Sequence, residues 1–492
     1  MTEQFMQTLP IELFSAQQAR DIDRKAQQQI PISDLQLMTA AAEAGFAAIQ
    51  THFPMVKKLL IVCGAGNNAG DGYLIAKFAL QSGYQVQLVA VGAIEKLAGD
   101  AALAHQAFVE VGGVVLHDFA SLDAVDLVVD ALLGTGLDRP VMGSFAMAID
   151  YVNNLSAQVL AVDIPSGLNA DTGNVMGCVV QAGMTITFIV LKQGLFTGLA
   201  ADYCGQILFA DLQVGAEIIA TEDCQVSLLS MQKLAKRSAC AHKGYFGHVL
   251  VVGGDYGYAG AAMLAAEAAL NAGSGLVSVA TRKQHAQQIH LACPELMGYA
   301  LNQVSDITAL LDKVTVLVLG PGLGQTAWAK ELWAELIQYN MPKVIDADAL
   351  NLLAESPCYA DNWVLTPHPG EAARLLNCTT ADILQDRFWA VRALQKQYGG
   401  VCILKGAGTL VTAGEHVYVN TTGNPGMASG GMGDVLAGII GALLAQKYTL
   451  LEAAKIGVYL HGLAADKAAK QKGERGLRAS EVLQFLRVVV ND

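Results

Sequence analysis

The sequence is poor in charged residues and lacks both a paired cysteine motif and a cluster of basic side chains. Only 15% of its 492 residues are charged, and 31 Lys and Arg against 44 Asp and Glu give a formal net charge of −13. We therefore expect neither nucleic acid nor a membrane as a partner. The nine cysteines include no C-x-x-C pair, so neither a zinc site nor a disulfide framework is implied.

The N-terminal stretch MTEQFMQTLPIELF lacks a basic region followed by a long apolar run, which argues against a secretory signal. We expect a cytoplasmic protein, and we also expect a homo-oligomer that acts on small molecules. Apolar residues make up 53% of the chain and glycine occurs 50 times. This composition is typical of a compact α/β protein with a well-buried core.

Two series of strand, glycine loop and helix follow one another along the chain. Length alone suggests about three domains, but the pattern weakens only once, in the polar segment 221–241. Within that segment SLLSMQKLAKR has the apolar spacing of a helix. We place a boundary there and predict two α/β domains, residues 1–224 and residues 225–492.

In the first series, polar side chains follow the ends of three predicted strands. The apolar run 59–63 leads into GAGNNAGDG and then into a helix predicted from about Gly72, as in a doubly wound parallel sheet. Ligands gather at the carboxyl ends of such strands, so Asn68, Asp130 and Ser166 are expected to converge. Their oxygens suit a group I or group II cation. The alternative is a set of ordinary polar turns.

The second series ends in NPGMASGGMGDVLAG, residues 424–438, a glycine loop that opens an apolar helix. Unpaired N–H groups and the positive end of the helix dipole would hold phosphate or another developing anion there. Asp434 lies at the start of this helix. It is either a catalytic base, which the dense glycine cluster favours, or a simple helix cap.

Nine motifs in order make both halves resemble the bifunctional family that repairs hydrated NADH and NADPH. GAGNNAGDG, LLGTGLDRP and AVDIPSGLNADTG resemble the epimerase family, which implies a Rossmann-like first domain. The motifs HKGYFGHVLVVGG, GPGLG, DADALN, TPHPGE, KGAGT and GNPGMASGGMGDVLAG resemble the dehydratase family, which implies a ribokinase-like second domain. The implied substrates are hydrated NADH and NADPH, with ADP or ATP as co-substrate.

For the first domain, the resemblance implies a potassium site at Asn68, Asp130 and Ser166, and Asp163 is predicted to be the acid/base. The family usually reads NNGGDG, and here Ala69 replaces a glycine; at positive φ this would cost about 1 kcal/mol. The residues implied in binding the hydrate are Asn67, Asn68, Ala69, Gly70, Asp71, Gly134, Thr135, Gly136, Leu137, Asp138, Arg139, Pro140 and Asp163.

For the second domain, the resemblance implies a kinase-like dehydration. Hydroxide is a poor leaving group, so Asp434 would accept the proton of the ring hydroxyl while a phosphoryl group is transferred to it, and phosphate then leaves. Mg²⁺ is a further candidate cofactor. The residues implied in binding the hydrate are Ala261, Gly324, His368 and Asp434. Those implied in binding the nucleotide are Lys405, Gly406, Ala407, Gly408, Thr409 and Gly433.

Several alternatives stay open at the level of the sequence. His368 could instead be a hydrogen-bonded turn residue, and Lys405 an ordinary lysine at a strand end. The whole chain could be a small-molecule kinase with an accessory first half, which would release a phosphorylated metabolite. The first half could also be a non-catalytic binding module, although the joint presence of Asp130, Arg139 and Asp163 argues against this.

Overall fold

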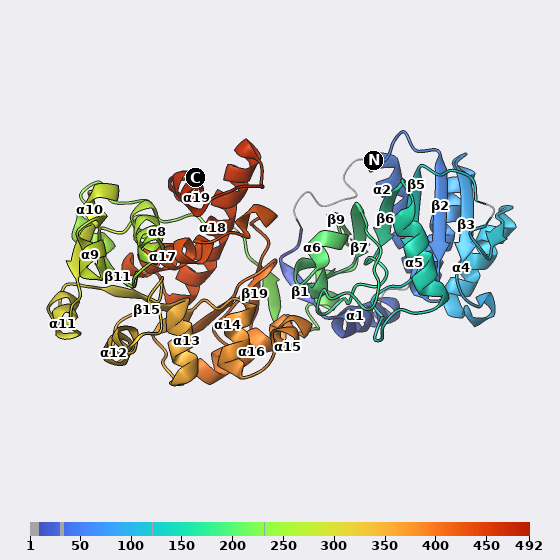
Figure 1. Ribbon diagram of the computed structural model, residues 1–492. Helices are drawn as coiled ribbons and strands as arrows, with labels where there is room; N and C mark the ends of the chain where they lie inside the picture. Colours follow the sequence, from blue (N-terminus) through green and yellow to red (C-terminus); the bar gives the residue numbers. More distant parts are fainter. Residues whose placement is uncertain (1–8, 30–33, 121, 231) are drawn as a thin grey trace. The chain divides into compact units, whose positions relative to one another are not determined.

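The computed structural model describes residues 9–29, 34–120, 122–230 and 232–492 (Figure 1). The chain divides into two compact units, Met1–Val226 and Ser227–Asp492, each an α/β layered structure. No helix among the described residues is both long enough and apolar enough to cross a membrane. The observed fold class, a Rossmann-like first unit and a ribokinase-like second unit, is the predicted one.

The first unit is built on a seven-stranded parallel sheet in the order β4-β3-β2-β5-β6-β7-β9. Its central strands are continuous apolar runs, and every residue of β5 is buried, because helices cover both faces. One face packs on helices α1 to α4 and the other packs on α5. A separate short parallel pair joins β1 to β8.

The elements of the first unit have the following bounds. The strands are β1 Glu12–Phe14, β2 Lys58–Cys63, β3 Gln85–Ala90, β4 Val115–Leu116, β5 Leu127–Ala131, β6 Gln158–Val162, β7 Met184–Phe188, β8 Leu191–Lys192 and β9 Gln206–Ala210. The helices are α1 Ala16–Gln29, α2 Asp34–His52, α3 Asn67–Gln81, α4 Gly99–Glu110, α5 Ser144–Asn154, α6 Ala200–Tyr203 and α7 Ala216–Ile219, with short 3₁₀ turns at Ile94–Lys96 and Gln193–Phe196.

Helix α3 begins at Asn67, earlier than the predicted start near Gly72. Ala69 therefore lies inside a helix, is fully buried and does not have positive φ, so the expected strain does not arise. The neighbouring glycines serve close packing. A Cβ on Gly70 would meet the Met38 sulfur at 2.4 Å, and one on Gly72 would meet the Ala131 Cβ at 2.6 Å. The NNAGDG motif therefore forms the first turns of α3, which pack closely against the sheet.

The second unit has a sheet in the order β13-β12-β11-β14-β15-β16-β17-β18-β19, parallel as far as β17 and antiparallel at β18 and β19. Helices α8 and α17 pack together on one face within the main apolar core (Figure 1). Gly438 permits this approach, because a Cβ there would lie 2.0 Å from the Ala265 carbonyl oxygen. The glycine loop that precedes α17 is thereby fixed to the centre of the unit.

The elements of the second unit have the following bounds. Its strands are β11 His248–Val252, β12 Leu276–Thr281, β13 Met297–Ala300, β14 Val316–Leu319, β15 Lys343–Ile345, β16 Trp363–Leu365, β17 Val401–Leu404, β18 Thr409–Thr412 and β19 Val417–Asn420. Its helices are α8 Ala259–Asn271, α9 Lys283–Ala286, α10 Ile289–Ala292, α11 Ser305–Leu311, α12 Ala327–Leu336, α13 Asp348–Glu355, α14 Pro369–Leu376, α15 Thr380–Gln385, α16 Arg387–Tyr398, α17 Met432–Ala445, α18 Leu450–Lys472 and α19 Ala479–Val489, with 3₁₀ turns at Lys243–Phe246 and Pro425–Met427.

The prediction of a helix for SLLSMQKLAKR is wrong. Strand β10, Val226–Leu228, occupies its start, and the described residues after it up to 238 have no regular secondary structure. The extended backbone is held by tertiary contacts. The Leu229 N–H donates to the Val419 carbonyl at 2.8 Å, and the Arg237 guanidinium lies 3.8 Å from the centre of the Phe246 ring. These contacts outweigh a weak local helix propensity.

Candidate functional sites

The first unit holds a cavity of about 510 Å³ beyond the carboxyl ends of β2, β5 and β6. Most of the residues implied in hydrate binding line it, but Ala69, Gly70 and Pro140 are not among its described lining residues. Ala69 and Gly70 instead face the protein interior between helices. The implied residues that do line it are Asn67, Asn68, Asp71, Gly134, Thr135, Gly136, Leu137, Asp138, Arg139 and Asp163.

Asp163, directly after β6, has an unusual backbone conformation, and its side chain forms an ion pair in the cavity wall. Its φ is +68°, a strained value for a residue other than glycine. Its Oδ1 lies 2.5 Å from the Nζ of Lys192, which is 4% exposed and also donates to the Thr187 hydroxyl at 2.9 Å and the Phe188 carbonyl at 3.1 Å. Three acceptors thus hold the ammonium group and leave Asp163 facing the cavity from one fixed position.

Two further carboxyl groups in this cavity have raised pKa values. Burial, and then the negative charges of Asp163 and Asp23, raise the pKa of Asp71 well above its usual range. Burial also raises the pKa of Asp23 to about 6, although Lys192 opposes this shift. This shift favours the protonated form of Asp71. A carboxyl group whose protonated form is favoured, beside an ion-paired carboxylate, suits acid–base chemistry.

The predicted cation ligands lie together, but only Asn68 is among the described lining residues of the cavity, and Asp130 and Ser166 are fully buried. The Ser166 hydroxyl donates to Asp130 Oδ1 at 2.6 Å, the Ser166 N–H donates to Asp130 Oδ2 at 2.8 Å, and Asn68 Nδ2 donates to the Leu133 carbonyl at 3.1 Å. The buried Asn68 Oδ1 has no hydrogen-bond partner among the described residues. Such an oxygen costs about 1–3 kcal/mol unless something else contacts it, so a small cation fits the donor set.

In the second unit, Asp434 is the third residue of α17, just after Gly431 at φ +91°. Burial, and then the negative charge of Asp346, raise the pKa of the Asp434 carboxyl to about 7, while Lys405 opposes the shift. A carboxylate at this pKa can both accept and release a proton near neutral pH. The first N–H groups of α17 point at the same place, because their intrahelical partners do not exist.

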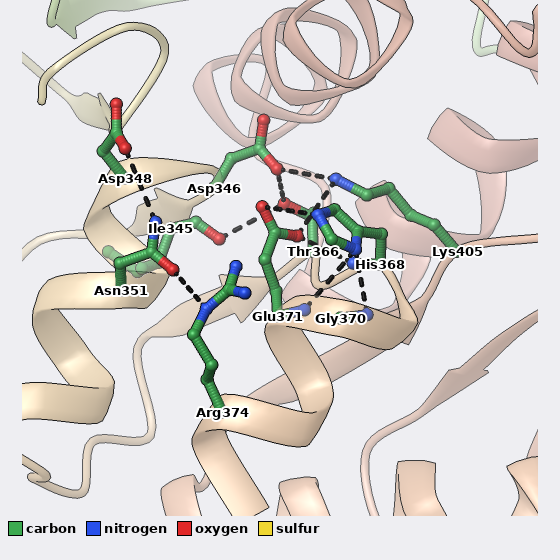
Figure 2. A network of polar contacts seen from close by, with 10 residues as sticks. All are labelled: Ile345, Asp346, Asp348, Asn351, Thr366, His368, Gly370, Glu371, Arg374 and Lys405. Carbon is green, nitrogen blue, oxygen red and sulfur yellow. Dashed lines mark hydrogen bonds and ion pairs between the residues drawn. The ribbon is translucent and has the colours of Figure 1, made fainter. Parts of the chain in front are cut away.

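Lys405, directly after β17, lies beside two acids, Asp346 and Glu371 (Figure 2), and its charge also acts on Asp434. Its Nζ lies 3.0 Å from Asp346 Oδ1 and 3.7 Å from Glu371 Oε2. A Cβ on Gly433 would lie 3.2 Å from the same Nζ, so this ammonium reaches the first turn of α17. The structure therefore brings together Lys405, Gly433 and Asp434, which the sequence assigned to phosphate binding and proton transfer.

His368 caps the start of α14. Its Nδ1 accepts the N–H groups of Gly370 at 3.0 Å and Glu371 at 3.4 Å, and Glu371 Oε2 accepts the His368 N–H at 2.8 Å (Figure 2). The hydrogen-bonded turn considered as an alternative is thus present. Burial and the nearby charge of Lys405 lower the pKa of the imidazole, so it is neutral at pH 7. Its contact with a hydrate stays a prediction.

Gly324 lies on the loop after β14, and Ala261 lies in the first turn of α8, which follows β11. The Gly324 N–H donates to Asp348 Oδ2 at 2.8 Å, and its φ is +74°. A Cβ on Gly322 would lie 3.1 Å from the Ala261 Cβ, so the loop after β14 packs against the first turn of α8. Asp348 follows Asp346 by two residues. The segment directly after β15 therefore contacts both Lys405, through Asp346, and the Gly324 loop, through Asp348.

Sequence reasoning missed several residues of these sites. In the first unit these are Asp23 and Lys192; in the second they are Asp346, Asp348 and Glu371. The last three lie inside the motifs DADALN and TPHPGE, so acids directly after apolar strands were a usable signal. Lys192 likewise ends an apolar run. Asp23 lies on the polar helix α1, whose charged residues are not distinguishable from a solvated face in the sequence.

The chain is similar to known proteins over its whole length. A family model described as YjeF-related protein N-terminus matches residues 34–194, and one described as NAD(P)H-hydrate dehydratase matches residues 249–487. The bifunctional NAD(P)H-hydrate repair enzyme Nnr of Coxiella burnetii is 44% identical, over 97% of this chain and 99% of the relative. The Escherichia coli protein of the same name is 42% identical, over 100% and 97%.

Among solved structures, an ADP/ATP-dependent NAD(P)H-hydrate dehydratase from Bacillus subtilis, co-crystallised with ATP and Mg²⁺, is 27% identical. The match covers 52% of this chain and 93% of that chain, with a TM-score of 0.46.

Proposed function

The chain belongs to the family of bifunctional NAD(P)H-hydrate repair enzymes, and from this premise we propose that its first unit epimerises hydrated NADH and NADPH and its second unit dehydrates the S form. The observation that carries the proposal is the position of Asp434. Its carboxyl has a pKa of about 7 and belongs to the glycine-rich first turn of α17, which the ammonium group of Lys405 approaches at Gly433.

In the second unit, Asp434 accepts the proton of the ring hydroxyl as a phosphoryl group is transferred from ADP or ATP to that oxygen. The N–H groups of Gly431 to Gly433 and the ammonium of Lys405 stabilise the charge on the transferred group. The ring nitrogen lone pair then expels phosphate, and loss of a proton from the adjacent ring carbon restores the nicotinamide double bond. Ala261, Gly324 and His368 contact the hydrate, and the segment Lys405–Thr409 contacts the nucleotide phosphates. Mg²⁺ would be carried mainly by those phosphates.

In the first unit, Asp71 and Asp163 form an acid–base pair. Asp71 protonates the leaving hydroxyl, which departs as water while the ring nitrogen lone pair forms a C=N bond. Water then adds to the other face of the ring carbon and Asp163 accepts its proton. The pair is supported by the raised pKa of Asp71 and by the ion pair of Asp163 with Lys192. The lining residues from Gly134 to Arg139 hold the rest of the dinucleotide.

A potassium ion is proposed at Asn68, Asp130 and Ser166, where the unpartnered Asn68 oxygen supports it. When bound, the ion supplies positive charge to the loops that form the cavity. Epimerisation is expected to be faster in potassium chloride than in choline chloride of equal concentration. Ser166→Ala should weaken K⁺ binding by about 10–100-fold, since supporting groups at metal sites have effects of this size. Equal wild-type rates in the two salts would contradict the site.

One assay tests the whole proposal. Purified full-length chain is mixed with R and S hydrates and ADP or ATP, and NADH, free phosphate and phosphorylated products are measured. Formation of NADH with free phosphate supports repair, whereas a stable phosphorylated metabolite supports the kinase alternative.

We also propose that residues 1–224 and 225–492 are independent domains, so fragments divided there should each retain one activity. Binding of the R form without epimerisation by the first fragment would identify that unit as a binding module.

The dehydratase should lose activity as the pH falls through about 7, because its base Asp434 then becomes protonated. The charge of Asp346 helps to raise this pKa, so Asp346→Asn should move the acidic limb of kcat/KM to lower pH. The exposed Asp361→Asn, outside the site, is the matched control and should leave the limb in place. An unmoved limb, or one at higher pH, in Asp346→Asn would contradict the assignment of Asp434 as the titrating group.

The cytoplasmic location and the homo-oligomer stay predictions, to be checked by fractionation and by light scattering.

A further inference from the structure

The segment proposed to bind the nucleotide, Lys405–Thr409, rests on a buried arginine from another element. Arg387 is the first residue of α16 and is only 2% exposed. Its guanidinium donates to the Leu404 carbonyl at 3.2 Å, to the Lys405 carbonyl at 3.3 Å and to the Ala407 carbonyl. Three backbone acceptors within four residues are thereby turned toward one side chain.

The hydrogen bonds to Arg387 also fix the direction in which the backbone N–H groups of the segment point. In a planar trans peptide the C=O group and the following N–H group point in opposite directions. Since the Lys405 and Ala407 carbonyls point at Arg387, the N–H groups of Gly406 and Gly408 point away from α16. Gly406 and Ala407 are also exposed. The segment therefore presents backbone donors on the side where phosphate oxygens would approach.

The two glycines of the segment fit this arrangement. Gly406 has φ +138°, and a Cβ there would lie 3.0 Å from a guanidinium nitrogen of Arg387. Gly408 has φ +61°. Glycine at Gly406 lets the backbone pass close to the guanidinium, and both positions need backbone conformations that other residues rarely adopt. The loop and the arginine are thus matched to each other.

We propose that Arg387 is a positioning residue for the nucleotide: it orients the peptide planes of Lys405–Thr409 and places a positive charge beneath the phosphates without touching them. This inference rests on the proposed nucleotide site. A guanidinium can serve several carbonyls at once from its planar fork, whereas a lysine cannot. Arg387 is therefore distinct from Lys405, which offers its ammonium group directly to the site.

The test compares Arg387→Gln and Arg387→Lys with Arg392→Gln. Arg392 lies on the same helix and donates to the Glu415 carbonyl at 2.9 Å, outside the segment, so it is the matched control. If a misplaced N–H group of the segment loses one hydrogen bond to a phosphate, about 1.4 kcal/mol, binding weakens about tenfold. We expect Arg387→Gln to raise the Kd and KM for ADP by at least this factor and Arg387→Lys to give an intermediate value. The KM for the hydrate and epimerisation by the same chain should not change.

Calorimetric titrations with ADP and with adenosine separate positioning from general stability. Adenosine has no phosphate, so its affinity should change less than that of ADP. An unchanged ADP affinity in Arg387→Gln, or an equal loss for ADP and adenosine, would overturn the inference and leave Arg387 a purely structural residue. If Arg387→Gln does not fold, Arg387→Lys is judged by the same two titrations. Lys405→Ala is measured in parallel: retention of ADP affinity there would contradict the nucleotide site itself.

Discussion

Asp434→Asn is expected to lower turnover of the S hydrate by at least 100-fold, since a general base contributes about 10²–10⁴-fold. Asparagine keeps the size of the side chain but cannot accept a proton at neutral pH. ADP affinity should stay the same or increase, because one negative charge beside the phosphates is removed. Dehydratase turnover and ADP binding, both measured on the purified variant, check this result.

If Asp434 were only a helix cap, the same variant should keep nearly normal turnover. Asparagine caps helices about as well as aspartate, so a residue that only capped α17 would leave turnover near the wild-type value. Epimerisation by the same chain is the internal control, because Asp434 belongs to the other unit. Near-normal dehydration would remove Asp434 from the proposed mechanism, whereas loss of both activities would indicate a folding defect.

Asp163→Asn is expected to abolish conversion of the R hydrate to the S hydrate while dehydration of the S form continues. The change removes the base and also leaves the ammonium of Lys192 without its charged partner at 2.5 Å. Breaking one side of a buried ion pair costs about 3–5 kcal/mol, so a lower melting temperature of the first unit is expected as well. Stopped assays that separate the two hydrate forms measure the rate.

A matched variant distinguishes the chemical effect from the stability effect. Asp202 is an exposed aspartate of the same unit that does not line the cavity. Asp202→Asn should leave epimerisation and melting temperature unchanged. A double variant, Asp163→Asn with Lys192→Met, removes the unpaired charge. It should recover stability without recovering activity, and recovery of activity would show that Asp163 is not the base.

The sequence allowed the layers of the fold to be predicted because their physical signals are local. Apolar runs such as 59–63 and 127–131 are buried on both faces of a parallel sheet, so they contain few polar residues. The motif residues at or just beyond the carboxyl ends of those strands had to lie at the same edge, because the strands are parallel. In this way Asn68, Asp130 and Ser166 could be placed near one another before any contact was known.

What could not be predicted depends on contacts between distant segments. Asp23 lies on a polar helix, and only the packing of α1 over the cavity gives it a raised pKa. Arg387 resembles any helix-starting arginine until the carbonyls of Leu404, Lys405 and Ala407 are seen to point at it. The helix predicted after Val226 is absent for the same reason, because hydrogen bonds to distant residues outweigh the helical spacing of its apolar residues.

The alanine in the first turn of α3 has a thermodynamic consequence. Glycine gives an unfolded chain more conformational freedom than alanine does, and a helix must remove that freedom. Ala69 adopts the helical conformation without positive φ, so we expect it to make folding more favourable by about 0.5–1 kcal/mol than a glycine would. The methyl group thus lowers the entropy lost when the turn that carries Asn68 and Asp71 forms, and it favours a cavity wall that is already ordered before substrate arrives.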